Sequence, residues 1–358
     1  MKIFFFAVNR SPFIIELVDT LYSYLPQGSS VKIILMHKMN EDRSHWGEKS
    51  CKNPILIDDK PKDIISSLKS DKPDCIIFTG YREREFIPVK KWAKKNDCKI
   101  FINAGEKITE YNCSPFFLWL KYQLFHLTTK GVNGVLAIGN RAMRLYQKYA
   151  DAPTIMIPYT FNMSRLLSFT PLRYDGKAIT FLISGRLEQF RDPIYSIKLF
   201  SELKEKRPNI KMDLIISGKG SLYEPILELI KELGIEDSVS WMNEFKEWSE
   251  IHDIYKKAHM LLCFQEYGGW GLVIPEAMAA GMAVACSSTV DSADNNIIDC
   301  YNGLYCNRED KNTTISSILD LIDNPDNFNK LRERARESAQ YGDVNFYAKR
   351  LASFIQEN

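Results

Sequence analysis

Residues 265–281 read QEYGGWGLVIPEAMAAG, a polar turn interrupted by glycines that continues into small and apolar residues. The turn follows an apolar run at 259–264, which predicts a buried strand. Pro275 predicts a helix that begins near it, because the amide hydrogen that proline lacks has no partner in a first helical turn. Strand, glycine-rich turn and helix in this order are typical of an α/β sheet.

Short apolar runs alternate with helix-length amphipathic segments in both halves of the chain. Continuous apolar strands separated by helices indicate parallel sheets that are covered on both faces. The alternation breaks at 162–177, where polar residues mix with proline and glycine. We therefore expect two α/β domains, over 1–165 and 175–340. The expected strands are 3–8, 31–36, 75–80, 99–104, 134–139, 154–158, 178–185, 212–218, 238–243, 259–264 and 283–287.

The composition excludes several classes of protein. With 358 residues and 45% hydrophobic content, the chain is large enough for two cores. Its eight cysteines form no CxxC pair, which argues against a zinc site or a disulfide framework and fits a reduced, cytoplasmic protein. The N-terminal apolar run is too short for a signal peptide, and no run approaches the length of about 18 residues typical of a membrane-spanning helix.

The net charge of +2 conceals a difference between the two halves. Residues 1–165 carry 25 basic and 16 acidic side chains, whereas the remainder carries 22 and 29. A basic half favours an anionic partner such as phosphate groups, although a chance scatter of surface charge gives the same counts. We expect no nucleic-acid partner, because the sequence has no compact basic run, zinc-finger spacing or aromatic RNA-binding motif.

The loops after the expected strands are the candidate ligand sites, because ligands of doubly wound sheets bind at the carboxyl ends of the strands. Arg186 and Arg191 lie five residues apart after one strand. Gly218 and Lys219 open a Gly-Lys-Gly turn after another. Glycine-rich turns that lead into helices expose amide hydrogens to an anion, and arginines neutralise a diphosphate. These loops predict a nucleotide-diphosphate site.

Glu276 has two interpretations. A carboxylate in the first turn of a helix is stabilised by the helix dipole, which is a purely structural role. Beside a phosphate-binding turn, the same carboxylate can accept two hydrogen bonds from the vicinal hydroxyls of a ribose.

Three segments together carry a resemblance: GRLEQFRDP (185–193), ISGKGSLYEPILELIKELGIEDSVSWMNEF (216–245) and GGWGLVIPEAMAAGMAVACS (268–287). They resemble the donor-binding half of the GT-B glycosyltransferases of family 4, the retaining group 1 type, over about 178–340. The resemblance implies two Rossmann-like domains that face each other across a cleft. It also implies a final helix, at about 341–358, that crosses back onto the first domain.

The resemblance further implies the ligands and the site residues. The second domain is expected to hold a nucleotide-sugar donor of the UDP or GDP type, and the first to hold a glycan or lipid-linked acceptor; no cofactor is implied. The catalytic positions are matched by Arg186, Arg191 and Glu276. The donor-binding positions are matched by Gly185, Gly218, Lys219, Glu266, Gly268, Gly269, Trp270, Gly271, Leu272 and Val273.

The chain departs from the family pattern in the turn before Glu276. The family has two glutamates eight positions apart, but Gly268 stands eight positions before Glu276. The nearest acid is Glu266, which the extra glycine can bring to the same place; alternatively, backbone amides replace it, or the site is impaired. A second departure is Arg191 at a position where lysine is usual, which keeps the charge but makes the donor group wider and flat.

The acceptor side of the first domain is less distinct. The loop VNRSP (8–12) lacks the glycines usual in the family. Side chains of this loop and of the loops after strands 75–80 and 99–104 can meet a hydroxyl or a phosphate, although ordinary surface loops have the same composition. The candidates are Asn9, Arg10, Tyr81, Arg82, Glu106 and Lys107.

Residues 114–130, SPFFLWLKYQLFHLTTK, predict a helix rich in aromatic residues and flanked by lysines. This composition suits the interface of an anionic membrane. Because the apolar residues nearly encircle the helix, burial in the core of the first domain explains the pattern equally well.

The chemistry implied by the resemblance requires positive charge. A nucleoside diphosphate leaves readily once its charge is stabilised, so arginines and amide dipoles can supply most of the catalysis. For a retaining transfer, the resemblance implies that the departing phosphate takes the proton of the acceptor hydroxyl. No DxD motif flanked by an apolar strand is present, so we expect no essential metal.

We expect a retaining glycosyltransferase that builds a bacterial surface polysaccharide or glycolipid at the inner face of the cell membrane. The alternative is a catalytically silent glycosyltransferase-like partner subunit, which the glycine at 268 suggests. A dehydrogenase that uses the turn at 218–220 is disfavoured, because the third glycine of GxGxxG is missing.

Overall fold

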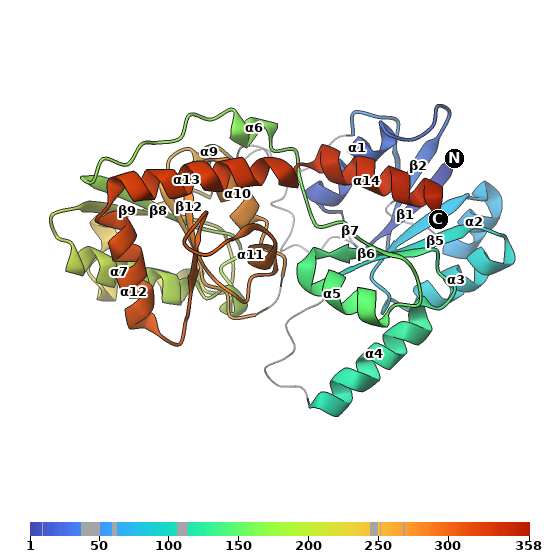
Figure 1. Ribbon diagram of the computed structural model, residues 1–358, viewed down its shortest axis with the longest axis horizontal. Coiled ribbons are helices and arrows are strands. Elements are labelled where there is room, and N and C mark those ends of the chain that lie inside the picture. Colours follow the sequence, from blue (N-terminus) through green and yellow to red (C-terminus); the bar gives the residue numbers. More distant parts are fainter. Residues whose placement is uncertain are drawn as a thin grey trace. The chain divides into compact units, whose positions relative to one another are not determined.

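Figure 1 shows the computed structural model of the protein, which describes residues 1–8, 10–36, 51–58, 63–105, 114–243, 250, 252–267 and 269–358. The chain divides into two compact units. The first comprises Met1–Asn162 together with Asp343–Asn358, and the second comprises Met163–Gly342. Each unit contains its own parallel sheet.

The sheet of the first unit has the strand order β3-β2-β1-β4-β5-β6-β7, and all of its described pairings are parallel. Its strands are β1 (Lys2–Ala7), β2 (Ser30–Leu35), β3 (Leu56–Asp58), β4 (Cys75–Thr79), β5 (Lys99–Gly105), β6 (Gly134–Ile138) and β7 (Thr154–Met156). Its helices are α1 (Pro12–Tyr22), α2 (Ile64–Asp71), α3 (Phe86–Lys95), α4 (Pro115–Thr129), α5 (Gly139–Tyr149) and α14 (Val344–Glu357).

Two cores cover the two faces of this sheet, because successive side chains of a strand point to opposite sides. In β1, Ile3 and Phe5 belong to the core that includes residues of α1 and α14. Phe4 and Phe6 belong to the core that includes residues of α2, α3, α4 and α5. The last helix of the chain, α14, therefore packs with α1 in the first unit.

The sheet of the second unit has the order β10-β9-β8-β11-β12-β13 and is also parallel in all of its described pairings. Its strands are β8 (Ala178–Ser184), β9 (Lys211–Ser217), β10 (Val239–Trp241), β11 (Met260–Cys263), β12 (Ala283–Ser287) and β13 (Leu304–Cys306). Its helices are α6 (Ser164–Leu167), α7 (Pro193–Lys206), α8 (Tyr223–Glu232), α9 (His252–Tyr255), α10 (Val273–Ala279), α11 (Asp291–Asn296), α12 (Lys311–Ile322) and α13 (Pro325–Ala339).

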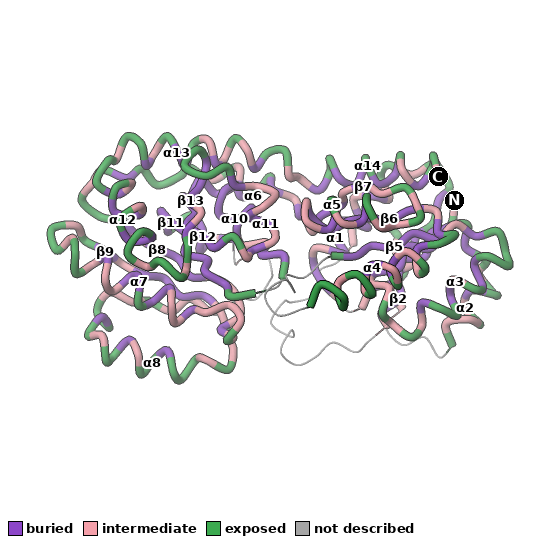
Figure 2. The backbone as a smooth tube through the Cα atoms, turned by 60° about the horizontal axis from the view of Figure 1, so that its bottom comes forward, coloured by how far each residue is buried: buried purple, intermediate pink, exposed green. Residues whose placement is uncertain are grey.

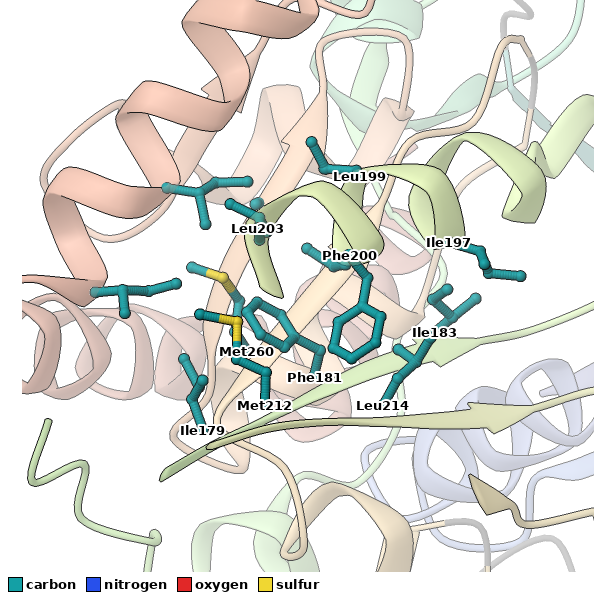
Figure 3. Close-up of a cluster of buried hydrophobic side chains, with 14 of the residues drawn as sticks. Ile179, Phe181, Ile183, Ile197, Leu199, Phe200, Leu203, Met212, Leu214 and Met260 are labelled. Atoms are coloured by element: carbon teal, nitrogen blue, oxygen red, sulfur yellow. The ribbon is translucent and has the colours of Figure 1, made fainter. Parts of the chain in front are cut away.

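The core between this sheet and α7 is densely apolar. Figure 3 shows Phe200 and Leu203 of α7 beside Phe181 of β8, with Met212 of β9 and Met260 of β11 close by. All five side chains are fully buried. Burial of this kind stabilises a domain by roughly 1.5–3 kcal/mol for each large apolar side chain.

The prediction of two Rossmann-like α/β domains is confirmed. Two strands were not expected from the sequence, β3 and β13, which have three residues each and lie at sheet edges. Runs this short give no periodic signal. Among the described residues, none of the helices combines the length and the apolar character needed to span a lipid bilayer.

Each sheet has one point at which the strand order changes direction. In the second unit this point lies between β8 and β11, and in the first unit it lies between β1 and β4. Loops at the carboxyl ends of such neighbouring strands diverge and leave a crevice for a ligand. The loops at these two points therefore hold the candidate sites of the two units.

Candidate functional site

The loops that follow β8, β9 and β11 form the candidate site of the second unit. The loop after β8 runs from Gly185 to Asp192, and that after β11 from Phe264 to Leu272. The backbone N–H of Glu266 donates to the carbonyl of Phe190 over 2.8 Å, which joins these two loops.

Glycines allow the loops after β8 and β9 to touch through their backbones. The N–H of Gly185 donates to the carbonyl of Ser217 over 2.9 Å. A Cβ atom on Gly218 would lie 1.8 Å from the carbonyl oxygen of Gly185, and Gly218 has a φ of +155°. A Cβ atom on Gly220 would lie 2.3 Å from the carbonyl oxygen of Leu187. No other residue type fits either position without displacement of the backbone.

The Gly-Lys-Gly turn also makes hydrogen bonds within the protein. The N–H of Gly218 donates to Oδ1 of Asn243 over 2.7 Å, so it is occupied within the protein. The carbonyl of Lys219 accepts from the N–H of Leu187 over 3.0 Å, and its side chain is exposed. The two glycines serve the contact between loops, and Lys219 is the part of the turn that remains accessible.

Arg186 and Arg191 both lie against the ring of Phe190. Their guanidinium carbons are 5.1 and 5.5 Å from its centroid, distances suited to cation–π contacts. Burial, and then the nearby charge of Arg186, lower the pKa of Arg191. Within the described part of the chain, no carboxylate forms an ion pair with either arginine.

Gln265 fixes the position of Arg191. Its Oε1 accepts from Nη1 of Arg191 over 3.0 Å, and its Nε2 donates to the carbonyl of Gly269 over 3.2 Å. The side chain of Gln265 is fully buried. The backbone carbonyl of Gln265 accepts hydrogen bonds from the hydroxyls of Ser287 and Thr289. Gln265 therefore connects one arginine to the glycine-rich turn and to the end of β12.

The glycine-rich turn is anchored to the segment that follows β12. Gly269 and Gly271 have φ values of +89° and +75°, and a Cβ atom on Gly271 would lie 2.5 Å from a methyl group of Val290. The carbonyl of Trp270 accepts from the N–H of Ser292, whose hydroxyl donates to the carbonyl of Gly271. These contacts attach the described part of the turn to the segment after β12.

The other residues predicted in this turn differ in exposure. Glu266 is exposed, Leu272 and Val273 are half-buried, and Trp270 is buried. Gly268 lies outside the described residues. The following helix begins at Val273, two residues before the predicted start at Pro275.

Glu276 is enclosed within the unit, with an exposed fraction of 3%. Its Oε2 accepts from the hydroxyl of Tyr255 over 2.5 Å, and its Oε1 lies 3.9 Å from Nε2 of His252. Burial raises the pKa of Glu276 to about 7, against a smaller lowering by the hydrogen bond from Tyr255. The carboxylate thus sits in the fourth position of α10, facing α9.

In the first unit, the described acceptor candidates lie at the change of strand order. Arg10 is in the loop between β1 and α1, and Tyr81 and Arg82 follow β4. Thr79 joins the two strand ends, since its hydroxyl accepts from the N–H of Val8 and donates to the carbonyl of Phe6. Three further candidates, Asn9, Glu106 and Lys107, lie outside the described residues.

Sequence reasoning missed Phe190, Gln265, Tyr255 and His252. Phe190 stands between the two arginines and Gln265 precedes the predicted turn, so neighbourhood in the sequence could have indicated both. Tyr255 and His252 reach Glu276 from another helix, and no local pattern reports such a contact. Among the described residues, no group of three or more histidine, cysteine, aspartate or glutamate side chains is placed to hold a metal ion.

Residues 167–340, which hold this entire set of loops, match the family Glycosyl transferases group 1. The second unit is therefore similar in sequence to a group 1 glycosyltransferase domain.

Curated relatives are similar to parts of this chain. An uncharacterized glycosyltransferase of Methanocaldococcus jannaschii is 27% identical over 238 residues, or 58% of this chain and 53% of its own. A D-inositol 3-phosphate glycosyltransferase of Thermobispora bispora is 26% identical over 176 residues, or 47% of this chain and 40% of its own. The chain spans about half the length of the curated relatives it matches.

Solved structures resemble the whole chain. A sucrose-phosphate synthase from Thermosynechococcus elongatus has a TM-score of 0.73 at 14% identity, covering 100% of this chain and 98% of that one. Anabaena HepE, solved in complex with UDP and glucose, has a TM-score of 0.71 at 14% identity over 100% of both chains. These likenesses confirm the GT-B fold class and, at this level of identity, concern the fold alone.

The contact between the loops after β8 and β9 predicts a steric effect at Gly218. Gly218→Ala should lower the free energy of unfolding of the second unit by about 2–4 kcal/mol, because a methyl group meets a backbone carbonyl. Gly234→Ala is the matched control: it has a φ of +62° but open space around its Cβ position. The control should lose only about 1 kcal/mol in urea unfolding. Equal losses in the two variants would contradict the steric origin.

The buried carboxylate of Glu276 predicts a pH dependence of stability. Its pKa rises from an ordinary value of 4.5 to about 7 on folding, so its contribution is complete below pH 4.5 and is lost as pH rises through 7. As pH rises from about 5 to 8, the wild type should therefore lose roughly 2–3 kcal/mol of unfolding free energy relative to Glu276→Gln. Urea unfolding across this range measures the difference. A constant offset between the two proteins would mean that Glu276 does not titrate there.

Proposed function

We propose that the protein is a retaining glycosyltransferase that moves a sugar from a nucleoside-diphosphate donor to a glycan or lipid-linked acceptor. One observation carries the proposal: Arg186 and Arg191 are held against one aromatic ring, and no described carboxylate pairs with either. Two neighbouring cations repel each other unless an anion lies between them. A diphosphate has the charge and the size that this pair requires.

The proposed catalysis stabilises the leaving group. As the bond between the sugar and the diphosphate breaks, negative charge grows on the phosphate oxygens that face the arginines. Arg191 is kept in place by Gln265, so its charge is positioned before the reaction begins. Preorganised charge of this kind is the largest contribution in many enzymes.

The acceptor hydroxyl attacks the sugar carbon from the same face as the departing diphosphate. Its oxygen forms the new glycosidic bond, and its proton passes to an oxygen of the leaving diphosphate. No side-chain base is needed, and we propose that no metal ion is essential, because the arginines supply the positive charge.

The two glutamates have separate proposed roles. Oε1 of Glu276 is enclosed and lacks a hydrogen bond among the described residues, so the ribose hydroxyls of the donor can supply the missing donors. Glu266 is exposed beside the glycine-rich turn, and we assign its carboxylate to the transferred sugar. This assignment lets Glu266 serve where the family pattern has a glutamate and this chain has glycine.

The proposed setting is the synthesis of a bacterial surface polysaccharide or glycolipid at the cytoplasmic face of the cell membrane. UDP in the Anabaena HepE complex supports a UDP donor, with GDP as the alternative. The competing proposal is a catalytically silent partner subunit, favoured by the glycine at the family glutamate position. Release of free sugar from a matching donor by the purified protein would exclude the silent subunit.

Removal of either arginine should impair turnover. Arg186→Ala and Arg191→Ala should each lower kcat by roughly 100-fold or more, because charge on the leaving group is greatest in the transition state. A thermal-shift panel of nucleotides identifies the donor, because a nucleoside diphosphate at about 100 times its Kd should add about 2.7 kcal/mol of stability. Steady-state kinetics with that donor then measure kcat of each variant. The matched control is Arg173→Ala, an exposed arginine of the same unit. Near-normal turnover in both site variants, or loss of activity with EDTA, would refute this mechanism.

Substitution of Glu266 distinguishes a sugar contact from a nucleotide contact. Glu266→Ala should lower kcat by about 10-fold or relax the choice of sugar, because it removes charge-assisted hydrogen bonds to the sugar. Binding of the free nucleoside diphosphate, measured by calorimetry, should stay unchanged. Glu188→Ala serves as the control, because Glu188 binds the backbone and hydroxyl of Ser221 instead. Unaltered kinetics in Glu266→Ala would mean that backbone groups of the turn, and not Glu266, contact the sugar.

A further inference from the structure

Helix α4 exposes a continuous row of large apolar side chains. Phe116, Leu124 and Leu127 have exposed fractions of 64%, 55% and 62%. Together with Leu120 they recur at the spacing of one helix face, and Phe117 and Trp119 extend that face on its two sides. Figure 2 shows α4 coloured mainly as exposed. Monomeric proteins rarely expose such a patch without a partner for it.

The opposite face of α4 is already occupied by the fold. Phe125 packs on the rings of Tyr81 and Tyr146, with centroids 5.0 and 4.4 Å away. Tyr122 stacks on Tyr149 at 4.5 Å. These contacts attach the helix to the first unit, so the outward apolar residues are not needed for its core. The alternative of a fully buried core helix, left open by the sequence, is therefore wrong.

The chain around α4 is basic. Residues 111–150 contain no aspartate or glutamate but carry five cations: Lys121, Lys130, Arg141, Arg144 and Lys148. Helix α3 adds four lysines and no acid within its own bounds. An ordinary solvated surface mixes both signs of charge, whereas residues 111–150 carry basic side chains alone.

Cations also lie directly against α4. Nζ of Lys90 donates to the carbonyl of Thr128, and Nζ of Lys94 donates to the carbonyl of Lys130, at the end of the helix. Burial, with Arg82 close by, lowers the pKa of Lys121 to about 8, so this lysine is still largely charged at neutral pH. Positive charge thus lies at the C-terminal end of α4 and, through Lys121, on the helix itself.

We propose that the outward face of α4, formed by Phe116, Phe117, Trp119, Leu120, Leu124 and Leu127, docks the protein on the surface of an anionic lipid bilayer. Aromatic and leucine side chains enter the boundary between head groups and acyl chains, while lysines remain among the lipid phosphates. At 15 residues, α4 is about 22 Å long and suits a position along the surface. The inference does not depend on the proposed transferase activity.

A second copy of the chain is a weaker occupant of the same face. Pairing two α4 helices would bring two basic surroundings together, and like charges across an interface are unfavourable. A bilayer that contains acidic lipids satisfies both features, because it accepts apolar side chains and neutralises the cations.

Docking through α4 would bring an acceptor loop to the lipid surface. Tyr81 contacts Phe125 of α4, and the guanidinium carbon of Arg82 lies 5.6 Å from the ring centroid of Tyr81. Given the proposed function, this placement favours a lipid-linked acceptor with an anionic head group over a free glycan.

Vesicle binding tests the docking surface. The full chain should sediment with vesicles of phosphatidylglycerol and phosphatidylcholine at neutral pH and low salt, and much less with phosphatidylcholine alone. Leu127→Glu should weaken this binding about tenfold or more, and Lys130→Gln about fivefold. The matched control is Leu56→Glu, which alters an exposed leucine of β3 in the same unit, with an exposed fraction of 69%. It should bind like the wild type.

Three results would overturn the proposal. They are absence of binding by the wild type, equal binding by Leu127→Glu and Leu56→Glu, and a wild-type dimer in solution that Leu127→Glu converts to a monomer. Emission of Trp119, obtained as the difference between wild type and Trp119→Phe, gives an independent measurement without a charged substitution. Its blue shift should appear only with anionic vesicles, and no shift would also contradict docking.

The experiment separates this inference from the proposed function. Leu127→Glu should bind the nucleoside diphosphate as the wild type does, because α4 belongs to the first unit and the arginines to the second. Lipid binding without any donor hydrolysis would refute the transferase and leave the docking surface intact. Donor hydrolysis without lipid binding would refute the docking surface and leave the proposed transferase intact.

Discussion

The loop after β8 lies backbone against backbone on the loop after β9, and the geometry of the candidate site depends on this contact. Gly218 leaves room for the carbonyl of Gly185, and Gly220 leaves room for that of Leu187. The backbone of the loop from Gly185 to Asp192 is therefore held in part by contacts that involve no side chain. Arg186 and Arg191 belong to this loop, so glycines that follow the neighbouring strand β9 help to determine where the positive charges lie.

The two arginines repel each other electrostatically, since, after burial, the charge of Arg186 contributes to lowering the pKa of Arg191. Two guanidinium groups share one aromatic ring, and burial lowers the pKa of Arg191. A nearby carboxylate would relieve the repulsion, but it would also occupy the place of an anionic ligand. Gln265 solves this differently, because a neutral amide can orient Arg191 without cancelling its charge. The positive charge of Arg191 is thus oriented but not neutralised by Gln265.

The fold was largely predictable from the sequence, and the site only in part. Long apolar strands such as 75–80 and 99–104 announce a buried parallel sheet, whereas β3 and β13 are too short to do so. The glycines of the turn at 218–220 were recognised, but their steric reason lies in another loop. Tyr255 and His252 were missed because their proximity to Glu276 arises from tertiary packing, which the periodicity of a sequence does not report. Helix α4 was predicted as a helix, but only burial could tell which of its apolar faces is covered.

The net charge of each half of the chain does not show where its charged side chains are concentrated. The second unit lies in the acidic half, yet its candidate site is centred on two arginines. Many of its acids lie outside the site, for example Glu224, Glu228 and Glu232 along α8. In the basic half, cations gather on α3 and around α4, where no acid lies between residues 111 and 150. Because charges farther apart than about 8–10 Å are screened in solution, such clusters act almost independently of the net charge. A diphosphate and an acidic bilayer can therefore be attracted to the same chain by separate groups of cations, one in each unit.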